Sequence, residues 1–513
     1  MEATSPRGSL IGYALLLVAL LTASVLVLPG LASRPLEIDE HVSYWISGAE
    51  NPGTIGERSL NYAATPPFSS FVQRGFLALG GKSTFWFRLP SVLGFLSAVV
   101  FTFLFARELL GPLPAGLAGQ LLVWHPGLVD QMRQARPYGI SVGLAAWLLW
   151  LTVRWCRTSG NIGLMFLWTF AAGALIWTHY LNLPLVGLVL IWLLGLPYLA
   201  IDGWKRPGWQ LAVACGLLAL SLLPLVPSLI RMQEWSPFLN FRTELPPFWK
   251  GVGPYWWLTL PVGFCGGWSL TRADRGSNIT LPLRTHLAVL MLCGLLPTVL
   301  LGTIPVGSLA TLAEPRYRLI YIPASVVLLS GCLLQRRNWI AALLASAIGI
   351  GCAWWILGER PWISNESSAS AAANWRELSV QLQQGGQPHE PIFVYSGLIE
   401  SRLIPALFKD ELFHDYVACR AGRFIIETPH PRYALPWFWT PETSLVEFYK
   451  ALLQESSNQV ATPVWLIAST DTDLGRESVE RFQELVAQHG YRETERTTTR
   501  NAVLIKLERI AIQ

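Results

Sequence analysis

Two neighbouring carboxylates, Asp39 and Glu40, come directly after the first hydrophobic segment of the chain, and His41 follows them. Acidic side chains at the end of a membrane segment lie in a low-dielectric environment, where they are usually kept for chemistry. Partial burial can tune the pKa of such a carboxylate so that it accepts a proton as a general base. We therefore predict that Asp39 and Glu40 are catalytic. The alternatives are a solvated acidic loop and a divalent-cation site, because hard cations favour clustered oxygen ligands.

Four basic residues form the second group of candidates. Arg74 and Lys82 precede the second apolar run, and Arg133 and Arg136 lie between two later runs. If segment 133–136 is helical, its two guanidiniums share one face. Guanidiniums this close to hydrocarbon are costly unless they meet an anion. We expect that anion to be a phosphate, with an internal carboxylate as the structural alternative. The first two cations could bind a lipid phosphate or simply extend to the membrane interface.

Aromatic and imidazole side chains accompany these cations at the ends of apolar segments. Thr178-His179-Tyr180 interrupts an apolar stretch, and Arg316-Tyr317 precedes another one. Taken singly, a histidine at the membrane edge is more often structural, and an arginine at a helix start can be an anchor. These residues therefore indicate a site only as a group.

The composition indicates a polytopic membrane protein. Hydrophobic residues make up 52% of the chain and charged residues 14%, and there are 24 tryptophans. Such a chain is too apolar for a soluble protein. The net charge of +5 comes from short Lys/Arg clusters between apolar runs, so no nucleic-acid groove is indicated. The seven cysteines show neither metal-binding spacing nor a disulfide framework.

Apolar runs of about 17–25 residues predict about eleven transmembrane helices. They lie near residues 9–30, 89–106, 113–129, 138–154, 162–179, 182–200, 209–230, 253–270, 285–303, 318–334 and 339–357. The first run is longer than the core of a signal peptide, which has roughly 7–15 residues, so we interpret it as a retained anchor.

Lys/Arg clusters in alternate loops predict that the N-terminus lies in the cytoplasm. All loops with candidate residues then lie on the exterior face, together with the tail after residue 357. That tail turns polar and contains strand-like runs at 391–396, 463–469 and 502–507, with helical patterns at 374–384 and 477–488. We predict a transmembrane catalytic domain at 1–358 and a small extracytoplasmic α/β domain at 359–513.

Taken in order, the motifs resemble the GT-C superfamily of glycosyltransferases that use polyprenyl-phosphate-linked sugars. The branch is that of the protein O-mannosyltransferases and the lipid A aminoarabinose transferases. The matching segments cover roughly the first 335 residues. They are Asp39-Glu40, Thr65-Pro66-Pro67, Arg88-Leu89-Pro90, Gln134-Ala135-Arg136-Pro137-Tyr138, Thr178-His179-Tyr180 and Arg316-Tyr317.

The resemblance implies a GT-C-like helical fold, a lipid-linked donor and an inverting single displacement on the exterior face. It implies that Asp39 is the base, with Glu40 beside it, and that Arg136 and Arg316 are cations for the donor phosphate. We extend the donor-phosphate set to Arg74, Lys82, Arg133, Arg136 and Arg316. The remaining candidates for substrate binding are His41, Tyr62, Tyr138, His179, Tyr180 and Tyr317.

The chemistry agrees with these residue types independently of the resemblance. An acceptor hydroxyl loses a proton as it attacks the anomeric carbon, and the departing phosphate gains charge that nearby cations stabilise. A metal is not required, although Asp39 and Glu40 could bind a divalent cation.

We therefore predict a multi-pass glycosyltransferase of the cell inner membrane, with a lipid, glycan or protein acceptor. A transporter or lipid flippase is the main alternative, because charges inside apolar spans also mark substrate paths. A membrane scaffold that binds a partner through its exported tail is a third hypothesis.

Overall fold

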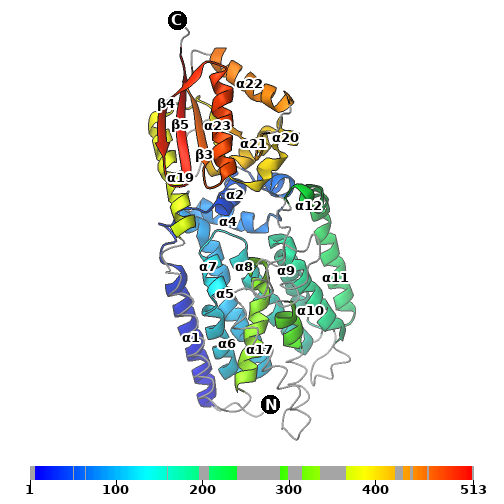
Figure 1. Ribbon diagram of the computed structural model, residues 1–513. Helices are drawn as coiled ribbons and strands as arrows, with labels where there is room; N and C mark the ends of the chain where they lie inside the picture. Colours follow the sequence, from blue (N-terminus) through cyan, green and yellow to red (C-terminus); the bar gives the residue numbers. More distant parts are fainter. Residues whose placement is uncertain are drawn as a thin grey trace. The chain divides into compact units, whose positions relative to one another are not determined.

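The computed structural model describes residues 6–49, 51–63, 65–158, 160–195, 207–239, 289–297, 315–334, 366–421, 431–439, 443–458 and 462–510 (Figure 1). The predicted spans at 253–270 and 339–357, and most of the span at 285–303, lie outside these residues. By their contacts, the residues form two compact units. Unit 1 comprises Met1–Ala32, Thr65–Leu229 and Arg242–Arg360, and unit 2 comprises Ser33–Ala64, Ile230–Phe241 and Pro361–Gln513.

The described part of unit 1 is helical (Figure 1). Its longer elements are α1 (Pro6–Val27), α4 (Phe68–Gly80), α5 (Thr84–Leu110), α6 (Pro112–Val123), α7 (Pro126–Met132), α8 (Tyr138–Arg157), α9 (Ile162–Thr178), α10 (Leu183–Gly195), α11 (Trp209–Leu222) and α17 (Ile322–Leu334). The described part also contains the short 3-10 helices η2 (Tyr180–Asn182), η4 (Leu223–Leu225) and η8 (Pro315–Tyr321) and the short π-helix η6 (Met291–Leu295). Helix α12 (Val226–Leu239) continues from unit 1 into unit 2.

Four of the described helical stretches are long and apolar enough to cross a membrane. They are Gly8–Val27, Thr84–Leu110, Tyr138–Arg157 and Trp209–Trp235. These stretches coincide with four of the predicted spans, and they indicate a multi-pass membrane protein. The predicted span at 113–129 is wrong as a single helix, because α6 ends at Val123 and α7 begins at Pro126. Proline lacks the N–H that a continuous helix needs and favours the first turn of a new one.

Helices α5 and α8 approach each other closely at glycines. A Cβ atom added at Gly139 would lie 2.2 Å from the Ser91 carbonyl oxygen, and one added at Gly94 would lie 2.5 Å from the carbonyl carbon of Gly139. Gly143 of α8 is equally close to the carbonyl oxygen of Gly94. Small residues are typical where membrane helices pack backbone to backbone. The first turn of α8 is therefore held firmly against α5.

Unit 2 is built on a five-stranded sheet with the strand order β2-β1-β3-β5-β4. Its strands are β1 (Ile392–Tyr395), β2 (Arg432–Ala434), β3 (Val464–Ser469), β4 (Tyr491–Thr498) and β5 (Ala502–Arg509). Strands β2, β1 and β3 are parallel, whereas β5 is antiparallel to both β3 and β4. The three runs that the sequence predicts as strands are β1, β3 and β5.

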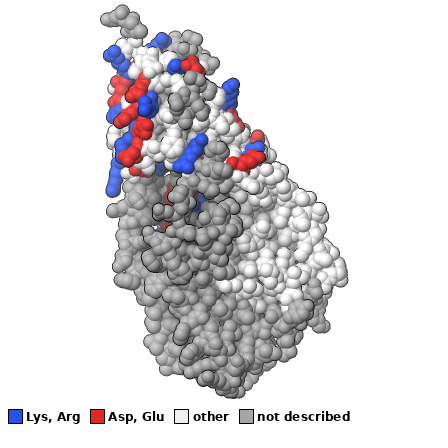
Figure 2. Space-filling view, turned by 45° about the vertical axis from the view of Figure 1, so that its right-hand side comes forward, with Lys and Arg blue, Asp and Glu red and all other residues white. Residues whose placement is uncertain are grey.

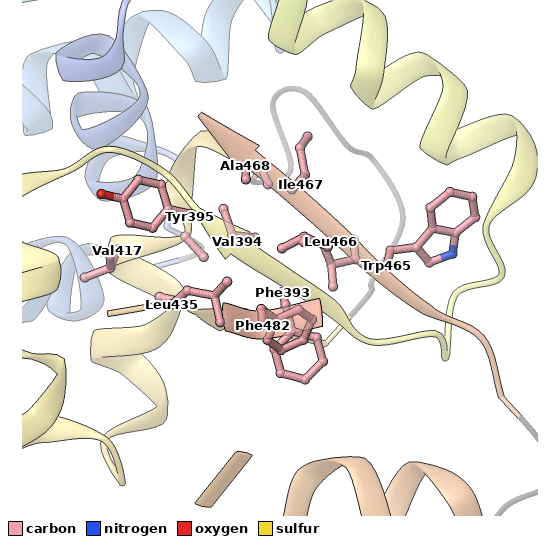
Figure 3. Close-up of a cluster of buried hydrophobic side chains, with 14 of the residues drawn as sticks. Phe393, Val394, Tyr395, Val417, Leu435, Trp465, Leu466, Ile467, Ala468 and Phe482 are labelled. Carbon is pink, nitrogen blue, oxygen red and sulfur yellow. The ribbon is translucent and has the colours of Figure 1, made fainter. Parts of the chain in front are cut away.

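Helices and turns connect and flank these strands. They are α19 (Glu366–Gly385), η9 (Ile399–Leu403), α20 (Ile404–Leu407), α21 (Glu411–Val417), η10 (Cys419–Ala421), α22 (Thr443–Asn458) and α23 (Asp473–Ala487). Strands β1 and β3 are buried along their whole length, and their side chains form a core with Phe482 of α23 (Figure 3). Fully buried strands with continuous apolar runs are typical of parallel sheets covered on both faces.

The segment that carries Asp39 and Glu40 belongs to unit 2 rather than to the helical unit. It forms α2 (Ile38–Ser47), α3 (Pro52–Glu57) and the short π-helix η1 (Arg58–Tyr62). Trp45 and Ile46 of α2 and Ile55 of α3 are part of the same buried cluster as the strands. The predicted transmembrane domain at 1–358 includes this segment, so a boundary at residue 358 misses its packing with the C-terminal strands.

The two units differ in surface chemistry. In the face shown in Figure 2, charged side chains gather on unit 2, whereas the large described surface at the lower right, which belongs to the helical unit, carries none. On helices α9 and α10 the exposed large side chains include Phe166, Phe170 and Ile191. An uncharged, apolar helix surface is suited to lipid, and a charged one is suited to water.

Candidate active site

Three rings from separate segments of unit 1 meet in one cluster: Tyr138, His179 and Tyr317. The His179 ring centroid lies 6.2 Å from that of Tyr138 and 5.2 Å from that of Tyr317, and the two tyrosine rings are 6.0 Å apart. Tyr138 begins α8, His179 lies in the break between α9 and η2, and Tyr317 lies in η8. The fold thus brings together three of the predicted substrate-binding residues.

Arg136 and Arg316 lie against this cluster. The guanidinium carbon of Arg136 is 5.5 Å from the centroid of the Tyr138 ring, and its Nη2 donates to the Tyr138 hydroxyl at 3.2 Å. The guanidinium carbon of Arg316 is 5.2 Å from the centroid of the Tyr317 ring. Both cations are close enough to His179 to act on it electrostatically. Two guanidiniums beside one imidazole concentrate positive charge in a way that suits a phosphate.

Hydrogen bonds to the backbone set the orientation of the cluster. The Leu181 N–H donates to Nδ1 of His179 at 3.2 Å, so the neutral ring carries its proton on Nε2. The Ser91 hydroxyl donates to the Arg136 carbonyl oxygen at 2.7 Å. The side-chain amide of Gln73, which is buried, donates to the Ala135 carbonyl oxygen at 3.0 Å. The short segment before α8 is therefore fixed by both α4 and α5.

A narrow hollow lies within the cluster. Its lining is formed by Tyr138, Ser141, His179, Asn182, Arg316, Tyr317, Leu319 and Ile320. The Asn182 amide donates to the Ser141 hydroxyl at 2.9 Å and to the Leu175 carbonyl oxygen at 2.8 Å. Ser141 and Asn182 were not predicted as site residues. Their signal in the sequence was a polar side chain within an otherwise apolar segment.

The other predicted donor cations lie elsewhere in unit 1. Arg133 donates through Nε to the Leu26 carbonyl oxygen at 2.9 Å, which satisfies a carbonyl at the end of α1. Lys82 is exposed in the turn between α4 and α5, and Arg74 is half-buried on α4. Tyr180 is half-buried at the start of η2. The described lining of the hollow includes none of these four residues.

Asp39 and Glu40 lie in the first turn of α2 in unit 2, and their environments differ. The Glu40 side chain is fully buried and accepts from the Glu37 backbone N–H at 3.0 Å, which closes a capping box at the start of the helix. Asp39 is half-buried and is close enough to Tyr416 to act on its hydroxyl electrostatically. His41 is buried on the same helix. Asp39 is therefore the more accessible carboxylate of the pair.

Tyr62, the remaining residue that we predict to bind substrate, lies in η1 of unit 2. Its hydroxyl donates to Oδ2 of Asp410 at 3.3 Å. Burial and the Asp410 carboxylate raise the pKa of Tyr62 above its ordinary value. The described residues contain no group of three His, Cys, Asp or Glu side chains that could hold a metal ion.

Comparison with known proteins agrees with this architecture. Residues 64–230 match the family model described as dolichyl-phosphate-mannose-protein mannosyltransferase. No curated protein matches the chain by sequence. The solved structures similar to this chain include ArnT from Cupriavidus metallidurans in the apo state, with a TM-score of 0.61 and 16% identity over 96% of this chain and 97% of that one.

ArnT bound to undecaprenyl phosphate gives a TM-score of 0.58, again with 16% identity over 96% of this chain and 97% of that chain. The archaeal oligosaccharyltransferase AglB from Archaeoglobus fulgidus, in complex with an inhibitory peptide and a dolichol-phosphate, gives 0.54 with 10% identity over 94% of this chain and 72% of that one. The predicted resemblance to the GT-C glycosyltransferases is confirmed, and the helical membrane fold is shared with them.

Proposed function

We propose that this protein is an integral membrane glycosyltransferase that transfers one sugar from a polyprenyl-phosphate-linked donor to an acceptor hydroxyl. The observation that carries the proposal is the pair of guanidiniums, Arg136 and Arg316, beside His179, in a fold that ArnT uses to bind undecaprenyl phosphate. A family model for enzymes that use dolichyl-phosphate-mannose covers the same part of the chain as Arg136, Tyr138 and His179.

In the proposed reaction the acceptor oxygen attacks the anomeric carbon of the donor sugar, and the bond from that carbon to the phosphate oxygen breaks. Asp39 takes the proton of the acceptor hydroxyl, and the polyprenyl phosphate leaves with one additional negative charge. Arg136 and Arg316 stabilise this charge, with the Nε2–H of His179 as a further donor. A single displacement inverts the configuration at the anomeric carbon. Glu40 supports Asp39 by holding the start of α2 through its cap.

The leaving group is a monophosphate that side chains can bind, so no metal is needed for this reaction. We propose that α2 and the rest of unit 2 lie on the extracytoplasmic side of the inner membrane and that the N-terminus is cytoplasmic. This orientation follows from the Lys/Arg clusters in alternate loops. The acceptor belongs to the lipids, glycans or proteins of that side.

The test is sugar transfer by purified protein from a panel of labelled polyprenyl-phosphate sugars to acceptors in a membrane extract. Asp39→Asn should lower kcat by at least about 100-fold, because general-base catalysis contributes roughly 10²- to 10⁴-fold. The control is Asp473→Asn, which makes the same change at an exposed carboxylate of unit 2. Near-normal turnover by Asp39→Asn would refute its role as the base. Movement of intact lipid-linked sugar across vesicles, without transfer, would instead support a flippase.

A further inference from the structure

A single carboxylate in unit 2, that of Asp415, binds residues from two distant parts of the chain. Asp415 lies in α21, and its Oδ2 accepts from the indole N–H of Trp45 in α2 at 2.7 Å. Its Oδ1 accepts from Nε of Arg432 in β2 at 3.1 Å. Arg58 of η1 contributes a second guanidinium, with Nη2 at 3.9 Å from Oδ2. We call Trp45, Arg58, Asp415 and Arg432 the Asp415 clamp.

Arg58 closes the clamp from the side of the first loop. Its Nη1 donates to the Trp45 carbonyl oxygen at 2.6 Å, and its guanidinium lies 4.5 Å from the centroid of the Trp45 ring. The Trp45 ring also packs against Tyr416, with the centroids 5.2 Å apart. Trp45 is therefore held by its indole N–H, its carbonyl oxygen and its ring at the same time.

The electrostatics of the clamp favour an ionised carboxylate at this half-buried position. Burial alone would raise the pKa of Asp415, but Arg432, the Trp45 indole N–H and Arg58 outweigh it and hold the pKa below its ordinary value. A partly buried carboxylate of this kind is stabilised when its partners are fixed in place. Removing one partner leaves the remaining half-buried groups with an incomplete set of hydrogen bonds and charges.

The clamp acts at one end of the helix that carries the proposed base. Helix α2 has ten residues, with Asp39 in its first turn and Trp45 near its end. A rise of about 1.5 Å per residue places Trp45 roughly 9 Å along the axis from Asp39. The capping box of Glu37 and Glu40 holds the first turn, and Trp45 ties the last turn to α21 and β2. The direction of Asp39 therefore depends on how α2 is anchored to the sheet.

We propose that the Asp415 clamp is a positioning site for the base: Asp415 and Arg432 of the C-terminal α/β fold set the orientation of α2 and thereby of Asp39. The inference rests on the proposed function, because it takes Asp39 to be the base. It makes the C-terminal fold part of the catalytic machinery. Tyr62 supports the same arrangement through its hydrogen bond to Asp410, which lies at the start of α21.

The test uses Trp45→Phe, which keeps an aromatic but smaller ring and removes the N–H donor, and Asp415→Asn, which keeps the size and removes the charge. The control is again Asp473→Asn, which removes an exposed ion pair with Arg476 in the same unit. Hydrogen exchange measured by mass spectrometry should show α2 amides opening about tenfold or more faster in both clamp variants, as expected for loss of a hydrogen bond to a charged group. The amides of β1 and β3 should be unchanged.

Kinetics supply the second readout. Both clamp variants should lower kcat by about tenfold or more and leave KM for the donor unchanged, because the proposed donor cations belong to unit 1. Unchanged exchange in α2, faster exchange throughout unit 2, or a normal kcat despite faster exchange in α2 would each overturn the proposal. Failure of the proposed function gives a different result, since the native protein would then transfer no sugar while exchange still reported on the clamp.

Discussion

At the scale of single residues, Arg136 and Arg316 each lie against a tyrosine ring. Arg136 lies over Tyr138 and Arg316 over Tyr317, and both act on His179. Contact with a ring stabilises a guanidinium without neutralising it. The two rings therefore help to orient the guanidiniums beside His179.

Arg136→Ala should weaken binding of a polyprenyl phosphate, because it removes a charge-assisted contact worth about 1.5–3 kcal/mol, or roughly 10- to 150-fold in Kd. The Kd of Arg136→Lys should lie between those of the native protein and Arg136→Ala. The lysine ammonium keeps the charge but cannot form the two parallel hydrogen bonds of the planar guanidinium. Direct binding of labelled polyprenyl phosphate measures this effect. Arg154→Ala, at the other end of α8 where Arg154 pairs with Glu108, is the control. An unchanged donor Kd in Arg136→Ala would make Arg136 a structural residue.

At the scale of elements, the packing of α5 on α8 decides where the cation site lies. Gly139 directly follows Tyr138 and touches the Ser91 backbone, while the Ser91 hydroxyl binds the Arg136 carbonyl oxygen. The same contact that joins the two helices thus fixes the segment with Arg136 and Tyr138. The segment that we predict to bind the donor phosphate therefore also contributes to helix packing.

Gly139→Ala should destabilise the protein by about 1–3 kcal/mol, because the added Cβ would lie 2.2 Å from a backbone oxygen and the helices must separate. We expect a lower midpoint of thermal unfolding in detergent together with weaker polyprenyl-phosphate binding. Gly187→Ala is the matched control, since its Cβ would meet no atom within 4 Å in α10. Equal effects of the two substitutions would show that close helix packing at Gly139 does not control the site.

At the scale of the whole molecule, the chain combines an apolar helical unit with a charged α/β unit that has its own buried core. The core of the second unit includes a neutral imidazole. His414 donates from Nε2 to the Phe408 carbonyl oxygen at 2.9 Å and accepts at Nδ1 from the Ala434 N–H at 3.1 Å. It therefore links α21, which carries Asp415, to β2, which carries Arg432.

Acid should destabilise this unit through His414. Burial lowers the pKa of His414, although its hydrogen bonds and the charges of Asp410 and Glu411 oppose the effect. Because the folded-state pKa is below the unfolded one, near 6.5, the stability contributed by the neutral ring is present above that pH and is lost as pH falls. Hydrogen exchange of β1 and β3 at pH 8 and pH 5.5 measures it.

His414→Gln should reduce this pH dependence, whereas His389→Gln, at an exposed position, should leave it unchanged. Strand exchange that is equally pH-dependent in the native protein and in His414→Gln would exclude His414 as the responsible group.

Features of this protein with a local signal could be predicted from its sequence. Helices that cross a membrane need long apolar runs whatever their partners are, so 138–154 and 209–230 could be recognised as spans. Strands β1 and β3 are buried along their whole length and are almost entirely apolar, so they too could be recognised by pattern. The residues of the cation cluster could be selected as candidates because costly charges and rings recur at the ends of apolar segments.

Only the tertiary structure decided which unit holds Asp39 and what distinguishes it from Glu40. The contact that assigns α2 to the α/β fold joins Trp45 and Asp415 across 370 positions, and no local pattern encodes such a pairing. Likewise, two adjacent carboxylates look equivalent in a sequence, yet the helix turns one into its cap and leaves the other half-buried. Composition and periodicity determine which segments are buried away from water. The role of an individual polar group depends instead on the partners that the folded chain places beside it.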